Sequence, residues 1–308
     1  MALHTTSGRW RVGLALALLT CGFWATLPVA LKISLETLDA YTLTWFRFLA
    51  AALFTLALLA ARGQLGGFSQ LNRLHWLYLL CAAAGLIGNY LLYLLGLKYT
   101  TPANAQLLIQ AAPLLLALGG IVFFKERVSL LQALGFAAIV LGLSAFFVEQ
   151  QQRAADHQVY LFGALLILLG AASWAAYALL QKQLLVVLRS QQIMAFIYLV
   201  AALVLLPLSA PSQLLQLDRT HWLSLAYCAI NTIGAYGAFA EALEHWEASR
   251  VSATLALTPI LTVLTVGALA PLMPQHLDPE RIGWLGWLGA AMVIAGSISA
   301  SLFRARDR

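Results

Sequence analysis

Residues Trp24–Lys32 read WATLPVALK, and 150 positions later residues Trp174–Lys182 read WAAYALLQK. Further matches follow at nearly the same spacing: His75-Trp76 with His221-Trp222 and Tyr90 with Tyr236 at 146, and Glu126-Arg127 with Glu280-Arg281 at 154. The spacing between matches varies by only a few residues, which is the size of a loop insertion. We therefore expect two copies of one structural unit, residues 1–150 and residues 151–308.

The composition predicts that this unit lies in a membrane. Of the 308 residues, 62% are hydrophobic and 10% are charged, with a mean hydropathy of +0.84, whereas soluble domains are ~45–50% apolar and ~25% charged. This balance excludes a water-soluble globular protein. It also argues against a disordered chain and a nucleic-acid partner, so the lipid bilayer is the expected environment.

Ten apolar runs are long enough to cross a bilayer, which takes ~20 residues. They lie at residues 11–31, 40–61, 74–97, 103–124, 128–148, 159–181, 192–210, 221–243, 249–272 and 283–303. The runs are continuous rather than alternating, so they predict helices and not barrel strands. Five helices per copy is an odd number, so the second copy enters the membrane from the opposite side. The predicted fold is all-α, with ten transmembrane helices as two inverted five-helix repeats around a central cavity, as is common among secondary transporters.

The distribution of basic residues predicts the orientation. With the N-terminus inside, twelve Lys and Arg residues fall in the inner loops and tails and five in the outer loops. Because inner loops carry the excess of positive charge, we expect both termini to be cytoplasmic.

Trp24 and Trp174 lie inside their predicted helices rather than at the ends, where tryptophans usually gather. An interior indole needs a partner for its N–H, and lipid offers none. Their matching repeat positions suggest walls of one central cavity, with Tyr177 on the same helical stripe as Trp174. The alternative is that both tryptophans only pack helices together.

Neutral polar side chains on four further helices predict the rest of the binding site, because unpartnered amides are costly in hydrocarbon. These residues are Asn89, Tyr90, Tyr93, Gln106, Gln110, Asn231 and Tyr236. For each, a hydrogen bond between helices is an equally good explanation. Pro113 and Pro259 interrupt backbone hydrogen bonds at matching positions and are candidate hinges.

Arg47 lies about 12 Å deep in its helix at 1.5 Å per residue, where an ionised group is expensive and a functional candidate. It could anchor a substrate carboxylate, bind helix-end carbonyls or extend outward to the interface. The acidic and histidine residues fall outside the span centres. The sequence therefore predicts no buried proton relay, no catalytic group, no metal cluster and no cofactor, and a protein that is not an enzyme.

Several short stretches resemble one transporter family. They are the sequence LKYTTPA at Leu97–Ala103, Pro113, the turn Lys125-Glu126-Arg127 before Gly135 and Gly142, and the interior Arg47. Together with the two five-helix repeats they resemble the EamA-type branch of the drug/metabolite transporter (DMT) superfamily, and within it the YddG-type exporters of aromatic and neutral amino acids. The second copy departs from the pattern at Glu247–Ser249, and Met273–Pro279 lengthens its last turn.

The resemblance implies a basket of helices one to four and six to nine, with helices five and ten set to the side. It also implies a carrier of the bacterial inner membrane that exports amino acids or similar small metabolites by alternating access. The alternatives are efflux of cationic drugs, carriage of another metabolite, a passive channel and, from another class, an intramembrane enzyme. The oligomeric state stays open, with a monomer as one possibility.

Overall fold

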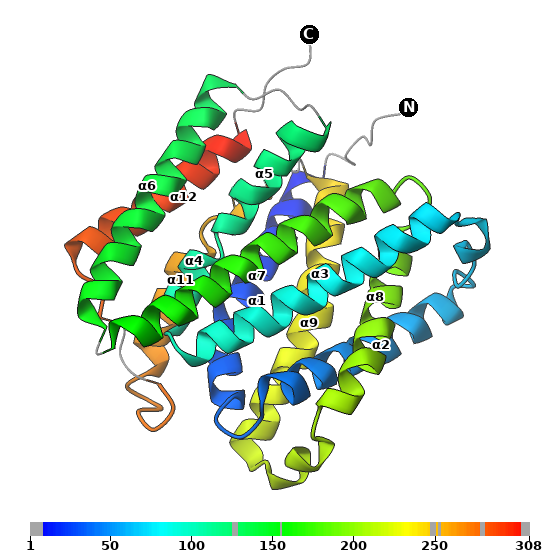
Figure 1. Ribbon diagram of the computed structural model, residues 1–308, viewed down its shortest axis with the longest axis horizontal. Coiled ribbons are helices and arrows are strands. Elements are labelled where there is room, and N and C mark those ends of the chain that lie inside the picture. Colours follow the sequence, from blue (N-terminus) through cyan, green and yellow to red (C-terminus); the bar gives the residue numbers. More distant parts are fainter. Residues whose placement is uncertain are drawn as a thin grey trace.

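The computed structural model describes residues 9–124, 129–154, 156–246, 251, 254–277 and 281–302, and every regular element within these residues is a helix (Figure 1). The helices are α1 Trp10–Ser34, α2 Ala40–Ala61, α3 Arg73–Lys98, α4 Pro102–Leu108, α5 Ala111–Phe124, α6 Leu130–Arg153, α7 His157–Leu184, α8 Ser190–Leu205, α9 Arg219–His245, α11 Thr258–Leu269 and α12 Trp284–Leu302, with short 3-10 turns η1 Phe68–Gln70, η2 Leu206–Leu208 and η3 Pro211–Gln216. In this part of the chain, six helices are long and apolar enough to cross a membrane: α1, α2, α3, α6, α7 and α8.

Polar side chains set where several helices begin. The Asp39 carboxylate accepts hydrogen bonds from the backbone N–H groups of Tyr41 and Thr42 at the start of α2. Asp218 does the same for His221 at the start of α9. Such caps satisfy N–H groups that have no partner inside the helix and so fix where the helix begins. Both helices start within about two residues of the predicted runs.

The predicted helix at 103–124 is interrupted. α4 ends at Leu108, residues Ile109 and Gln110 form a turn, and α5 begins at Ala111. Pro113 has no N–H to donate to the Ile109 carbonyl, so a continuous helix would lack that bond. The predicted second copy has a similar start, because α11 begins at Thr258 with Pro259 at its second position. Both prolines thus lie in the first turn of a half-helix, where a missing N–H costs nothing, and not within one continuous helix as predicted.

Helices α6 and α12 pack side by side at one edge of the molecule (Figure 1). A Cβ added to Gly142 would lie 2.5 Å from the Gly289 carbonyl oxygen, and one added to Gly135 would lie 2.7 Å from that of Gly296. The small residues therefore let the two backbones touch. Glycines at matching positions of the two predicted copies thus lie in the contact between α6 and α12.

Glu149 lies just beyond the predicted run 128–148, but the structure places it inside a helix. α6 continues to Arg153, and Glu149 is only 6% exposed. Its carboxylate accepts hydrogen bonds from the backbone N–H groups of Gly283 and Gly286 at the start of α12 and pairs with Arg153 at 3.2 Å. A helix N-terminus favours negative charge, so this carboxylate fastens α12 to α6.

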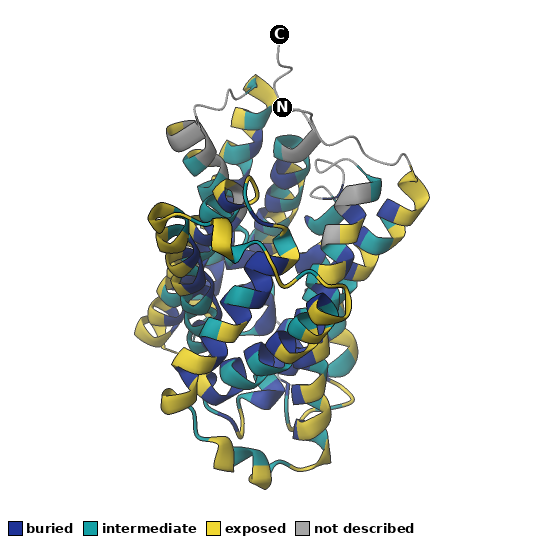
Figure 2. Ribbon diagram, turned by 90° about the vertical axis from the view of Figure 1, so that its right-hand side faces the viewer, coloured by how far each residue is buried: buried dark blue, intermediate teal, exposed yellow. Residues whose placement is uncertain are grey.

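The remaining long helices pair across the two predicted copies. α1 packs on α9, α2 on α8, and α3 on α7. The largest buried cluster lies among α2, α3, α7 and α8 and holds Phe48, Tyr90, Tyr177 and Tyr198. Figure 2 shows buried residues toward the middle and exposed residues on the outer faces. Many exposed residues are apolar, such as Leu53 and Val122, as expected of surfaces that face lipid.

Candidate substrate-binding site

The two interior tryptophans each pack against a tyrosine. The ring of Trp24 on α1 packs edge-on against Tyr236, with centroids 5.8 Å apart. Trp174 on α7 packs against the same buried cluster as Tyr236, and its ring contacts Tyr177 at 6.4 Å. Four residues predicted for the site thus form one connected aromatic group.

Arg47 lies deep in the protein and is 3% exposed. Its Nε donates a hydrogen bond to Thr232 Oγ1 of α9 at 3.0 Å, and its Cζ lies 4.6 Å from the centre of the Tyr90 ring. Within the described residues, no carboxylate pairs with this guanidinium, which carries five N–H donors in all. The buried charge is therefore held by a hydroxyl and an aromatic face, with donors left over for a ligand.

Two further rings join this group that were not predicted as site residues. Phe48 packs on Tyr90 with centroids 4.5 Å apart and on Tyr198 at 5.8 Å. Tyr198 and Tyr90 belong to one buried cluster, and Tyr236 packs against it. The repeat could have revealed both rings, because Phe48 and Tyr198 are separated by the same 150 positions as Trp24 and Trp174.

The two predicted asparagines hold helices together. Asn89 Nδ2 donates to the Gly170 carbonyl at 2.9 Å and ties α3 to α7. Asn231 Nδ2 donates to the Phe23 carbonyl at 2.6 Å and ties α9 to α1, while its Oδ1 is buried without a partner. These contacts fit the packing alternative for both side chains.

The predicted glutamines lie where α4 gives way to α5. Gln106 is buried in α4 and accepts a hydrogen bond from the Tyr93 hydroxyl at 3.3 Å. Gln110 is half-buried in the turn between the half-helices. Pro113 follows in the backbone of α5, but its side chain lies outside the described residues, and Pro259 is buried at the start of α11.

A hollow of about 990 Å³ lies elsewhere, between the segments 63–70 and 185–192. None of the predicted site residues lines it. The aromatic residues of the candidate site instead touch one another directly. A substrate that binds among them must therefore separate these rings.

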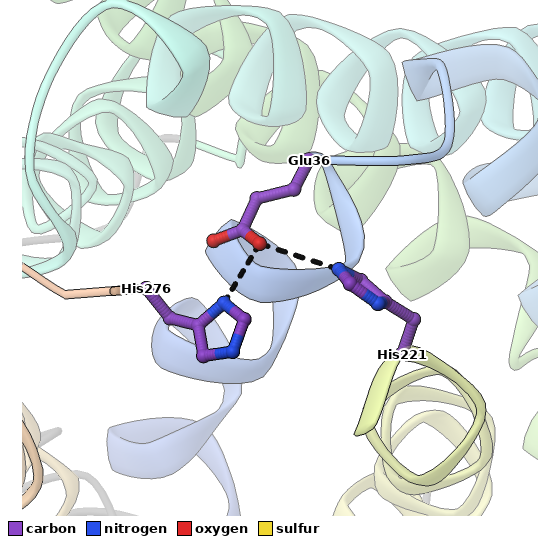
Figure 3. A group of neighbouring side chains, drawn as sticks. All are labelled: Glu36, His221 and His276. Atoms are coloured by element: carbon purple, nitrogen blue, oxygen red, sulfur yellow. Dashed lines mark hydrogen bonds and ion pairs between the residues drawn. The ribbon is translucent and has the colours of Figure 1, made fainter. Parts of the chain in front are cut away.

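A second polar group brings together three side chains of the kinds that bind metals, whereas the sequence predicts no metal cluster. Glu36, His221 and His276 meet at the end of the molecule where α1 ends and α9 begins (Figure 3). The sequence hides this group because Glu36 is separated from the histidines by 185 and 240 positions. Beside it, hydrogen bonds from the backbone N–H and the ring of His221 hold the pKa of Asp218 below its ordinary value.

Comparison with known proteins decides the family. The sequence model of the EamA-like transporter family matches residues 11–148 and again residues 161–302. This chain belongs to the EamA-like transporter family. An "Uncharacterized transporter" of Haemophilus influenzae is 33% identical to it over 291 residues, which cover 94% of this chain and 95% of that protein. The "Uncharacterized inner membrane transporter YhbE" of Escherichia coli K12 is 33% identical over 296 residues, or 94% of this chain and 91% of its own.

A solved crystal structure supports the fold of this EamA-like chain. The two share 20% sequence identity, with a TM-score of 0.65 over 97% of each chain. The match to the family model and the 33% identical relatives confirm the predicted EamA resemblance. The chain is a multi-pass membrane transporter, and its relatives are described as transporters.

Proposed function

We propose that this EamA-like transporter exports aromatic and other neutral amino acids across the bacterial inner membrane by alternating access. Its two halves would be inverted five-helix repeats, with cytoplasmic termini and the substrate near the midplane between them. The two matches to one family model and the pairing of α1 with α9 and α3 with α7 support a duplicated unit. Rocking of one half against the other would then change these cross-copy contacts.

The observation that carries the substrate class is the environment of Arg47. An ionised side chain deep in a membrane protein is expensive and is retained when it serves a partner or a pathway. Arg47 has Thr232 and the Tyr90 ring as neighbours and no acid among the described residues. A substrate carboxylate would supply the missing negative charge, and arginine binds carboxylates through paired N–H groups.

The aromatic group around Tyr236 and Tyr90 supports an apolar or aromatic side chain on that substrate. Rings attract one another in edge-on and offset arrangements, worth about 0.5–1.5 kcal/mol per pair beyond area burial. Trp24 already contacts Tyr236 in such an arrangement, and Trp174 contacts Tyr177 in the same way. A substrate ring could replace one of these contacts at little cost, so the closed aromatic group could open around its cargo.

The interrupted helices support the hinge role of the two prolines. The turn at Ile109–Gln110 lies directly before α5, and α11 starts beside Pro259 in the same way. Breaks of this kind are typical of transporters, in which half-helices border the binding site. The half-helices could tilt independently, which alternating access requires.

Counterflow into proteoliposomes tests this proposal. Purified full-length protein should exchange labelled phenylalanine or leucine with unlabelled internal substrate, and uptake should saturate. Trp24→Ala and Trp174→Ala should lose exchange, whereas Trp284→Ala, at a residue 78% exposed, should retain it. Exchange of cationic drugs but not amino acids would overturn the substrate class, and unsaturable flux would indicate a channel.

A further inference from the structure

Glu36, His221 and His276 form a compact group outside the candidate substrate-binding site. Glu36 follows α1, His221 lies in the first turn of α9, and His276 lies in the turn after α11. The Glu36 Oε2 atom is 3.2 Å from His221 Nε2 and 2.8 Å from His276 Nδ1 (Figure 3). The three ligand atoms all lie within 4.8 Å of one another.

The contact between His221 and Asp218 leaves the other ring nitrogen of His221 turned toward Glu36. His221 Nδ1 lies 2.8 Å from Asp218 Oδ1, and His221 Nε2 lies 3.2 Å from Glu36 Oε2. A hydrogen on Nε2 can bridge the imidazole and the carboxylate, and so can a metal cation that takes the place of that hydrogen.

We propose that Glu36, His221 and His276 bind a divalent transition-metal ion, with Zn²⁺ as the best fit. Imidazole nitrogens and a carboxylate oxygen are standard zinc ligands at ~2.0–2.2 Å, so tetrahedral ligands lie ~3.3 Å apart. The separations of 3.2 and 2.8 Å from Glu36 are close to that spacing. Three protein ligands leave a fourth position for water. Mg²⁺ and Ca²⁺ fit less well because they prefer six or more oxygens.

Asp218 completes the site as an outer carboxylate. A metal-binding histidine usually donates its other N–H to a carboxylate or carbonyl, which orients the ring and makes the ligating nitrogen more basic. The contact from His221 Nδ1 to Asp218 has this arrangement. The His221 side chain is 9% exposed, so its orientation is fixed by packing, whereas the Glu36 side chain is 34% exposed and gives an ion access from water.

The lengthened last turn of the second copy supplies the third ligand. His276 N–H and Leu277 N–H both donate to the Met273 carbonyl. Leu277 is 4% exposed and packs with Val29 and Ile33 of α1. This apolar contact holds His276 near the end of α1. The lengthened turn that begins at Met273 thus positions one of the three ligands.

The first copy offers a matched position without the site. His75 lies 146 positions before His221, and its Nδ1 accepts a hydrogen bond from Asn72, the N-cap of its own helix. The position 150 residues after Glu36 is Val186, so the carboxylate is missing there. His75 is therefore the natural control for His221.

A bound ion would join the end of α1 in the first copy to α9 and the α11 turn in the second. The predicted orientation places this end on the face away from the cytoplasm. Because an ion that binds the folded state stabilises it by mass action, the metal would hold these helix ends together. It would thus favour the state in which this end is closed.

The test uses the full-length protein in detergent, stripped with a chelator and then titrated with Zn²⁺ by calorimetry. Wild type should bind one Zn²⁺ per chain and should give the absorption bands of tetrahedral cobalt when Co²⁺ replaces it. Glu36→Gln and His276→Ala should each lose that equivalent. His75→Ala should keep it, and Asp218→Asn should bind about 10- to 100-fold more weakly.

Two results would overturn the proposal. One is the absence of saturable Zn²⁺ binding to wild type. The other is a Zn²⁺ equivalent that persists in both Glu36→Gln and His276→Ala, which would show that the ion binds elsewhere. If the buried His221→Ala variant does not fold, these two partly exposed residues still decide the outcome, since each variant is first checked for an unchanged elution volume.

Discussion

The guanidinium carbon of Arg47 lies 4.6 Å from the centre of the Tyr90 ring, while Nε of the same side chain donates to Thr232. A cation over an aromatic face is attracted by the ring, by ~2 kcal/mol or more where water is excluded. These contacts fix the side chain of α2 against α3 and α9. They leave the terminal N–H groups of the guanidinium available to a ligand that binds between these helices.

Arg47→Ala should weaken binding of amino acids by about 10- to 100-fold, because charge-assisted hydrogen bonds contribute ~1.5–3 kcal/mol and 1.4 kcal/mol is tenfold. Amide or amine analogues that lack the carboxylate should be affected far less. Competition against labelled amino acid in counterflow measures both. Arg62→Ala, at an exposed residue after the same helix, serves as the control. Equal losses for both substrate types would assign Arg47 a purely structural role.

A double-mutant cycle tests for a hydrogen bond between Trp174 and Tyr236, which pack against the same buried cluster. Trp174→Phe keeps a ring but removes the indole N–H, and Tyr236→Phe removes the hydroxyl that would accept from it. A buried hydrogen bond contributes ~0.5–1.5 kcal/mol, so the double variant should lose that much less than the sum of the single variants. A scintillation proximity assay gives the substrate affinity of wild type, the two single variants and the double variant. Strict additivity would show that the two groups act independently.

Much of the helical framework could be predicted from the sequence because lipid leaves few choices. A backbone without water must satisfy its own hydrogen bonds, so each long apolar run becomes a helix. The close approach of Gly142 to Gly289 has a related cause, since association in lipid relies on backbones that approach closely. The break after Leu108 was missed because a proline within an apolar run fits both a bend and a new helix start.

The site was harder to predict because its contacts are long-range. Trp24, Trp174 and Tyr236 could be proposed one at a time, but only the fold shows that Tyr236 contacts Trp24 and packs against the same buried cluster as Trp174. Glu149 lies just beyond the predicted run 128–148, and its partners Gly283 and Gly286 lie more than 130 positions away. Composition and periodicity describe a single helix and carry no information about which helix lies opposite.

Gly142→Ala should destabilise the protein, because the new methyl group would meet the backbone of α12, which cannot move aside cheaply. Its Cβ would lie 2.5 Å from the Gly289 carbonyl oxygen, and overpacking of this kind costs about 1–3 kcal/mol. Gly237→Ala is the matched control, since nothing lies within 4 Å of its added Cβ and Ala favours a helix by ~1 kcal/mol over Gly. In detergent, the thermal unfolding temperature should be highest for Gly237→Ala, intermediate for wild type and lowest for Gly142→Ala. The reverse order would mean that α6 and α12 are not in contact.

Glu149→Ala should also lower the unfolding temperature. Two further variants separate the contribution of its hydrogen bonds to α12 from that of its ion pair with Arg153. The carboxylate accepts from two backbone N–H groups at the start of α12, and a buried donor left without a partner costs ~1–3 kcal/mol. Arg153 is about half exposed at 48%, and exposed ion pairs contribute ~0–1 kcal/mol. Arg153→Ala should therefore change little. Glu149→Gln keeps an accepting oxygen and should fall between the two. If Arg153→Ala proves as damaging as Glu149→Ala, the ion pair and not the helix N-terminus is what Glu149 serves.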